Sequence, residues 1–197
     1  GTIEIDGVDV TRLPEYKRAT YLGRVFQDPM TGTAATMSIE ENLALARRRG
    51  QRRTLRWGIT NAEREEYKKA LATLGLGLES RMSSKVGLLS GGQRQAVTLL
   101  MATLKRPKLL LLDEHTAALD PKSSETLMKI TEKVVKEKHL TTLMVTHNLR
   151  FAVEYGSRLV MMHGGSAVMD IDGEAKKNLV VDDILGKFNE ISIECGN

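Results

Sequence analysis

The chain has a single cysteine, Cys195, so no disulfide can form within its 197 residues. A protein without disulfides suits a reducing compartment. No apolar run approaches the roughly 18 residues of a membrane-spanning helix. The opening residues GTIEIDG lack the basic and apolar segments of a secretory signal. The composition, 41% hydrophobic and 27% charged, therefore describes an ordinary globular domain, with one inserted subdomain expected.

One more absence concerns phosphate binding. Loops of the form G-x-x-x-x-G-K-[ST] cradle phosphates with backbone N–H groups and a lysine. The only Gly-Lys pair is Gly186-Lys187; Phe188 follows it, and Val181 stands five residues before Gly186. The loop is therefore absent from these 197 residues.

The segment LSGGQRQ, residues 89–95, nevertheless predicts an anion site. An apolar helical face follows it, so Ser90 is expected near the N-cap of a helix, where unpaired N–H groups and the helix dipole favour an anion. Gly91 and Gly92 would let a phosphate approach the backbone closely. Ser-Gly-Gly alone is more simply an ordinary helix cap, but the full string with Gln93 is much rarer.

Two carboxylates follow the apolar run LLLL at residues 109–112, which is typical of a parallel strand buried on both faces. Asp113 and Glu114 would then stand at the carboxyl edge of a sheet, where α/β proteins bind ligands. Asp113 is a candidate to hold Mg²⁺, and Glu114 to orient and polarise an attacking water. Taken alone, the pair is equally well explained as two solvated acids at a strand end.

Two further polar residues follow expected strands. Gln27 comes after GRVF and could contact Mg²⁺ or the attacking water through its amide. His147 comes after LMVT, and a neutral imidazole there could donate a hydrogen bond to a γ-phosphate. Each residue alone is more simply structural, and the remaining histidines, His115, His139 and His163, are interpreted as structural or solvated.

Hydrophobic periodicity predicts an α/β fold with a small antiparallel portion at its N-terminus. Residues 1–10 read as a half-buried hairpin around an Asp-Gly turn, and residues 38–106 as mostly helical. The alternation of strand and helix after residue 109 indicates a parallel layer, and a hairpin and a helix are expected near the C-terminus.

Net charge is +4, and its excess is local: six arginines crowd into RRRGQRRTLRW, namely Arg47, Arg48, Arg49, Arg52, Arg53 and Arg56. A solvated surface is the favoured interpretation, with a membrane-headgroup or nucleic-acid contact as alternatives.

The order of these motifs resembles the nucleotide-binding domain of ATP-binding cassette (ABC) transporters over nearly all of the chain. VFQDP resembles the family's Q-loop, LSGGQ its signature, and LLLLDE its Walker B strand with the catalytic glutamate. AALD, ending at Asp120, resembles the D-loop, and VTH the switch histidine. His115 stands where the family often has proline. The resemblance implies a P-loop NTPase-like core in residues 1–37 and 107–197, with a helical signature subdomain in residues 38–106.

What the resemblance implies about residues is specific. Glu114, His147 and Gln27 would be catalytic; Asp113 and Gln27 would contact Mg²⁺; and ATP would be bound by Ser90, Gly91, Gly92, Gln93, Asp120 and His147. In the family, an adenine-stacking aromatic and the phosphate loop precede the GTIEIDG strand. We therefore expect that segment to lie upstream, and this chain alone to be inactive without it.

The resemblance also implies partners. ATP would be held between two copies of the subunit, which would energise separate integral-membrane permease subunits from the cytoplasmic face of the membrane, with a substrate-binding protein if the system is an importer. No nucleic acid is expected. Two other classes of function stay open: a non-transport ABC ATPase acting on nucleic acid or the ribosome, and a nucleotide-independent interaction module.

Overall fold

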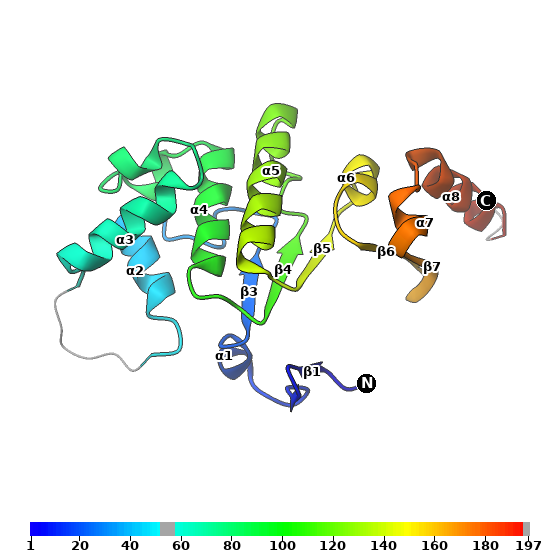
Figure 1. Ribbon diagram of the computed structural model, residues 1–197, viewed down its shortest axis with the longest axis horizontal. Helices are drawn as coiled ribbons and strands as arrows, with labels where there is room; N and C mark the ends of the chain where they lie inside the picture. Colours follow the sequence, from blue (N-terminus) through cyan, green and yellow to red (C-terminus); the bar gives the residue numbers. More distant parts are fainter. Residues whose placement is uncertain (52–57, 195–197) are drawn as a thin grey trace. The chain divides into compact units, whose positions relative to one another are not determined.

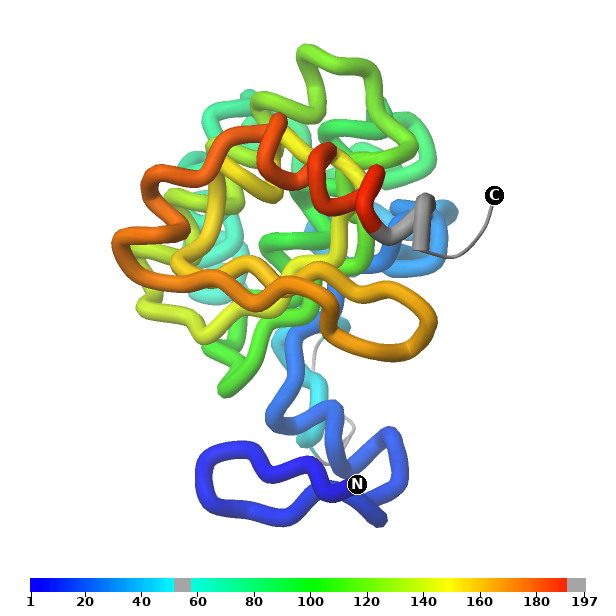
Figure 2. Tube along the Cα trace, turned by 90° about the vertical axis from the view of Figure 1, so that its right-hand side faces the viewer, coloured from blue at the N-terminus to red at the C-terminus, as the bar shows by residue number. Residues whose placement is uncertain are grey.

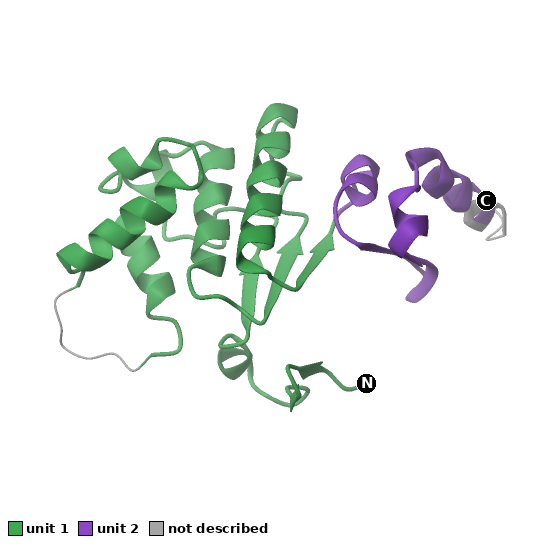
Figure 3. Cartoon of the chain, viewed as in Figure 1, with its two compact units in different colours: residues 1–145 green, residues 146–197 purple. Residues whose placement is uncertain are grey.

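The computed structural model describes residues 1–51 and 58–194, with side chains described to residue 190. The chain forms two units, Gly1–Val145 and Thr146–Asn197 (Figure 3). This division does not test the subdomain predicted for residues 38–106, which stays a prediction.

A three-stranded parallel sheet forms the centre of the first unit, in the order β3-β4-β5 (Figure 1). The strands are β3 (Leu22–Val25), β4 (Leu109–Asp113) and β5 (Thr142–Val145). In register, Val25 stands beside Leu112 and Leu112 beside Met144, so the carboxyl ends of the strands share one edge. The predicted parallel α/β layer is thus confirmed, and the residues that follow the strands are brought to that edge.

Helices cover one face of this sheet. Helices α4 (Gly91–Thr103) and α5 (Pro121–Lys138) pack side by side, and α4 also lies against β3 (Figure 1). Leu110 and Leu112 are buried, whereas Leu143 and Val145, on the alternate face, are 58% and 53% exposed. No described segment of this unit covers the second face of β5, which therefore stays exposed.

The region between β3 and β4 is mostly helical, as expected. Helix α2 (Ile39–Arg47) begins at a capping box formed by Ser38 and Glu41, a pattern of two residues three positions apart. Helix α3 (Asn61–Ala72) begins at a second box, formed by Thr60 and Glu63. Two short 3₁₀ helices, η1 (Leu78–Ser80) and η2 (Val86–Leu88), lead into α4.

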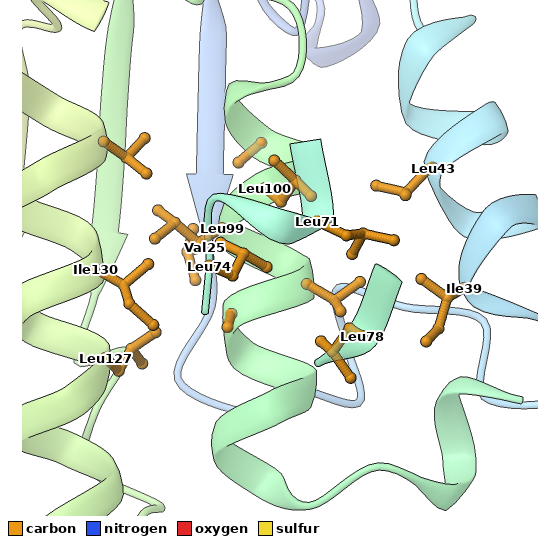
Figure 4. Packing of buried hydrophobic residues seen from close by; sticks show 14 of the residues in the cluster. Val25, Ile39, Leu43, Leu71, Leu74, Leu78, Leu99, Leu100, Leu127 and Ile130 are labelled. Carbon is orange, nitrogen blue, oxygen red and sulfur yellow. The ribbon is translucent and has the colours of Figure 1, made fainter. Parts of the chain in front are cut away.

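One continuous core joins these helices to the sheet. In Figure 4, side chains from α2, α3, α4, α5 and β3 converge on a single cluster. Leu99 of α4 lies within this cluster and is fully buried. Burial of this apolar surface, at roughly 25 cal/mol per Å², holds the signature helix α4 against the sheet.

The N-terminal segment forms the predicted hairpin, with β1 (Glu4–Ile5) antiparallel to β2 (Val8–Asp9). Asp6 and Gly7 turn the chain with φ of 55° and 75°, which suits an Asp-Gly turn. The hairpin lies at one end of the unit and is more exposed than expected (Figure 2). Next along the chain, the short helix α1 (Glu15–Arg18) starts after Pro14.

The second unit contains the predicted hairpin and final helix. Strand β6 (Arg158–His163) pairs antiparallel with β7 (Ser166–Asp172). Its helices are α6 (Leu149–Glu154), α7 (Gly173–Lys177) and α8 (Val181–Glu194). A small core unites the unit, formed by Leu159, Met161, Leu179 and Ile184. Across both units, none of the described helices combines the length and apolarity needed to span a bilayer.

Leu99→Ala tests whether α4 is held by this core. Truncating a fully buried leucine should lower the free energy of unfolding by about 2–5 kcal/mol, from lost burial and the cavity left behind. Leu88→Ala is the matched control, because Leu88 lies one turn before the same helix but is 74% exposed; it should change stability by less than about 0.5 kcal/mol. Urea unfolding of the two variants measures both, and equal losses would contradict the assigned packing.

Candidate functional site

Helix α4 begins where the sequence predicts. Ser90 is its N-cap: the Ser90 hydroxyl accepts from the Gln93 N–H at 3.3 Å, and the Gln93 amide oxygen accepts from the Ser90 N–H at 3.2 Å. The other first-turn N–H groups have no acceptor within the helix. The helix therefore presents donors and the positive end of its dipole at the exposed residues Ser90 and Gly91.

Gly91 and Gly92 also meet a packing requirement. A Cβ atom added to Gly92 would lie 3.1 Å from Cβ of Ser123, and one added to Gly91 would lie 3.1 Å from Cδ2 of Leu119. Both distances are tighter than ordinary carbon contacts. The two glycines thus allow α4 to approach the start of α5 closely, whatever they do for a ligand.

A surface pocket of about 180 Å³ lies between the starts of α4 and α5. Ser90, Gly92, Gln93, Lys122 and Ser123 line it with polar groups, beside the apolar Leu127 and Ile130 of α5. Backbone donors, hydroxyls and the Lys122 cation fit an anion, and no acidic side chain lines the pocket. The donor set is therefore compatible with the phosphate expected at this helix end.

Asp120 has a structural role in this arrangement. Its carboxylate is the N-cap of α5 and accepts from the Ser123 N–H at 3.0 Å. Hydrogen bonds from the Ser123 side chain and backbone hold the pKa of Asp120 below its usual value. Asp120 thus orients the α5 start that packs on Gly92, and its predicted contact with ATP stays a prediction.

Asp113 ends β4 and forms an ion pair across the sheet. Nη2 of Arg24, on β3, lies 3.0 Å from Oδ2 of Asp113, and both side chains are about half exposed. The Arg24 guanidinium also lies 4.4 Å from the centre of the Phe26 ring. A Mg²⁺ ion needs only one or two carboxylates when phosphates and water complete its shell. Asp113 can supply such a carboxylate, but a Mg²⁺ ion would compete with the Arg24 guanidinium for it.

Glu114 adopts a backbone conformation that is uncommon outside glycine, with φ of 43°. Its N–H donates to the carbonyl of Val145 at 2.9 Å, and its carbonyl accepts from the Ala117 N–H at 2.9 Å. Such strained residues persist only where surrounding bonds determine them, and they cluster at functional sites. β5 and the turn after β4 together impose the conformation of Glu114.

Gln27 lies two residues beyond the end of β3, at the same sheet edge as Asp113 and Glu114, and it is exposed. His147 lies two residues beyond the end of β5 but belongs to the second unit. The structure therefore brings Gln27, Asp113 and Glu114 to one edge of one unit, and His147 stays a prediction from the sequence. In the described ranges, no group of three His, Cys, Asp or Glu is placed to hold a metal ion.

Gln95 is a buried polar residue that sequence reasoning missed. It lies on α4 with no exposed surface, and its Nε2 donates to the carbonyl of Phe26 at 2.7 Å and to that of His115 at 2.8 Å. The signal was present in the sequence, because Gln95 stands among the apolar residues of the helix just after LSGGQ.

His115 is structural, as the sequence suggested. The ring is 2% exposed, and its Nε2 lies 3.3 Å from Oγ1 of Thr131. The Thr131 hydroxyl already donates to the Leu127 carbonyl, so the imidazole must donate from Nε2. Burial lowers the pKa of His115 from 6.5 to about 4, which keeps the ring neutral at ordinary pH.

Two of the arginines at the end of α2 form ion pairs. Arg47 forms an ion pair with Glu66, and Nη2 of Arg48 lies 3.0 Å from Oε1 of Glu63. These contacts agree with the solvated-surface interpretation. Arg52, Arg53 and Arg56 lie outside the described residues.

Comparisons with known proteins identify relatives over most of the chain. The family model described as ABC transporter matches residues 1–117. The tyrosine transport ATP-binding protein of Clostridioides difficile is 47% identical, over 95% of this chain and 74% of that protein. The phosphonates import ATP-binding protein of Frankia casuarinae is 36% identical, over 68% of this chain and 53% of that protein. A solved dimeric ATP-binding cassette, in a post-hydrolysis state with ADP and Pi, superimposes with a TM-score of 0.69 at 27% identity, covering 87% of this chain and 73% of that one.

His115 should give the protein an acid-sensitive stability. The unfolded chain binds a proton at the imidazole below pH 6.5, whereas the folded chain does so only near pH 4, so stability falls as pH falls through that window. Between pH 7 and pH 4.5 this single group should remove about 2 kcal/mol. Urea unfolding of His115→Gln, which keeps a donor for Thr131 but does not titrate, should lack that loss. His163→Gln, at an exposed histidine, should retain it, and a wild-type slope in His115→Gln would refute the assignment.

Proposed function

The chain belongs to the ABC transporter family as an ATP-binding subunit with ATPase activity, and from this premise we propose which of its residues perform the reaction. Glu114 is the general base that orients and polarises the attacking water, and Gln27 and His147 assist it. The observation that carries the proposal is the backbone of Glu114, held in a left-handed conformation at the sheet edge beside Asp113.

Asp113 and Gln27 are proposed to contact the Mg²⁺ ion that accompanies ATP. When bound, that ion would neutralise charge on the phosphates. This chain contributes an oxygen ligand at Asp113 and an amide at Gln27, both at the sheet edge. The Arg24 guanidinium beside Asp113 must give way for the carboxylate to coordinate a cation.

The signature segment is proposed to act on ATP bound by a second copy of the subunit. The start of α4 is exposed, and it lines a pocket that has no acidic side chain. Ser90, Gly91, Gly92 and Gln93 would receive the γ-phosphate of the partner, and Asp120 would stand beside it. Support comes from the dimeric form of the similar solved cassette with ADP and Pi.

The cargo and partners are proposed from relatives. The similarity to a tyrosine transport protein favours an import system for an amino acid. The subunit would bind integral-membrane permease subunits at the cytoplasmic face, through the helical subdomain 38–106 and the Q-loop, and a separate protein would capture the solute. The ion pairs of Arg47 and Arg48 favour a solvated surface over a nucleic-acid contact for these two arginines.

Glu114→Gln tests the catalytic assignment, in the subunit with an upstream phosphate-binding loop present. The amide cannot accept a proton, so turnover should fall by about 10²–10⁴-fold. ATP affinity should persist, and an ATP-bound dimer should accumulate because it cannot be cleared. The measurements are steady-state ATPase rate and size-exclusion chromatography with Mg-ATP. Glu125→Gln, at an exposed site on α5, is the control; near-wild-type turnover by Glu114→Gln would remove Glu114 from the mechanism.

Ser90→Arg tests whether the signature acts on a partner's nucleotide. The bulky cation would occupy the phosphate position at the start of α4. ATP titration of the monomer should change less than about two-fold, whereas crosslinking of the closed dimer should be lost. Ser83→Arg, at an exposed position between η1 and η2, should change neither the ATP affinity of the monomer nor the crosslinking of the dimer. A collapse of monomer affinity in Ser90→Arg would mean that the motif serves nucleotide on its own chain.

A further inference from the structure

Gln95 joins three segments that carry proposed site residues. It lies on the signature helix α4, one turn after Gly91 and Gly92. Its Nε2 donates to the carbonyl of Phe26, the residue before Gln27, and to the carbonyl of His115, the residue after Glu114. One amide group therefore contacts the backbone next to both residues proposed to act in hydrolysis, just before Gln27 and just after Glu114.

The orientation of this amide is fixed by its neighbours. Both partners are carbonyl oxygens, which only accept, so the NH₂ group must face them with both of its protons engaged. Oε1 is buried and lacks a partner in the described structure. An orphaned buried acceptor is a cost, so the two donated bonds must outweigh it for the arrangement to persist.

We propose that Gln95 is a positioning residue, which holds the Q-loop and the segment of the catalytic glutamate in fixed relation to the signature helix. It acts on the reaction through Gln27 and Glu114 rather than as a catalytic residue itself. The proposal rests on the roles proposed for those two residues.

Glu114 needs this third constraint. Its own N–H and carbonyl are fixed by Val145 and Ala117, but the next carbonyl, that of His115, accepts from Gln95. Without that donor, the peptide between His115 and Thr116 could rotate, and the turn that holds Glu114 at positive φ would lose one of its constraints. A misplacement of about 1 Å in a catalytic group can cost 10²-fold in rate, so loss of the two bonds should lower kcat more than ATP affinity.

The first test compares two variants in the subunit with its upstream phosphate-binding loop. Gln95→Met keeps the side-chain length but removes both donors, and kcat should fall about ten-fold or more while KM for Mg-ATP stays within about three-fold. Thr103→Val is the matched control: Thr103 is buried on the same helix, and its hydroxyl bonds only carbonyls of α4 itself. It should cost stability without this kcat effect.

A pH profile separates positioning from packing. In Gln95→Glu, an ionised carboxylate would face two carbonyl oxygens, whereas the protonated acid can donate to one of them. The kcat of Gln95→Glu relative to wild type should therefore rise as the pH is lowered from 8 to 6, while that of Gln95→Met should stay constant. Loss of packing alone would leave both ratios independent of pH.

A double-mutant cycle completes the test. If Gln95 acts through Gln27 and Glu114, then adding Gln95→Met to Glu114→Gln should lower kcat by a smaller factor than it does in the wild-type background, whereas adding Thr103→Val should have the same effect in both backgrounds. Full additivity, or wild-type kcat in Gln95→Met, would overturn the proposal. Wild-type turnover in Glu114→Gln would instead overturn the role of Glu114, so the two failures are distinguishable.

Discussion

The parallel pairing of β3, β4 and β5 is the constraint on which the rest of the first unit depends. Parallel strands end at the same edge, so residues separated by almost ninety positions, Gln27 and Asp113, are brought to one edge of the sheet. Helix α4 then lies against β3, and its position fixes where its first turn stands relative to that edge. The chemistry assigned to the site therefore depends on where the three strands end and on where helix α4 begins.

Close packing between the starts of α4 and α5 is a second constraint on the site. Gly91 and Gly92 bring the start of α4 against Leu119 and Ser123, and Asp120 caps the helix that begins there. The signature and the D-loop are therefore one structural element rather than two adjacent motifs. A substitution that enlarges Gly92 would displace the start of α5 as well as any ligand at α4.

Local signals in the sequence were sufficient to predict much of this arrangement. Both the Ser38 capping box and the cap at Ser90 depend on residues three positions apart, so they can be read directly. The apolar run before Asp113 likewise identified a core strand. What could not be read were contacts set by distant segments: the ion pair of Arg24 with Asp113, the two carbonyls bound by Gln95, and the exposed face of β5. Their physical origin lies in tertiary packing, for which a single sequence holds no periodic signal.

The buried imidazole of His115 has a consequence for the electrostatics of the catalytic neighbourhood. It occupies the position directly after Glu114, yet it acquires no charge until the pH approaches 4. The electric field at Glu114 therefore does not change through protonation of His115 at ordinary pH. Any inflection in the rate of hydrolysis between pH 5 and pH 8 must arise from other titrating groups, so His115 contributes a constant background rather than a switch.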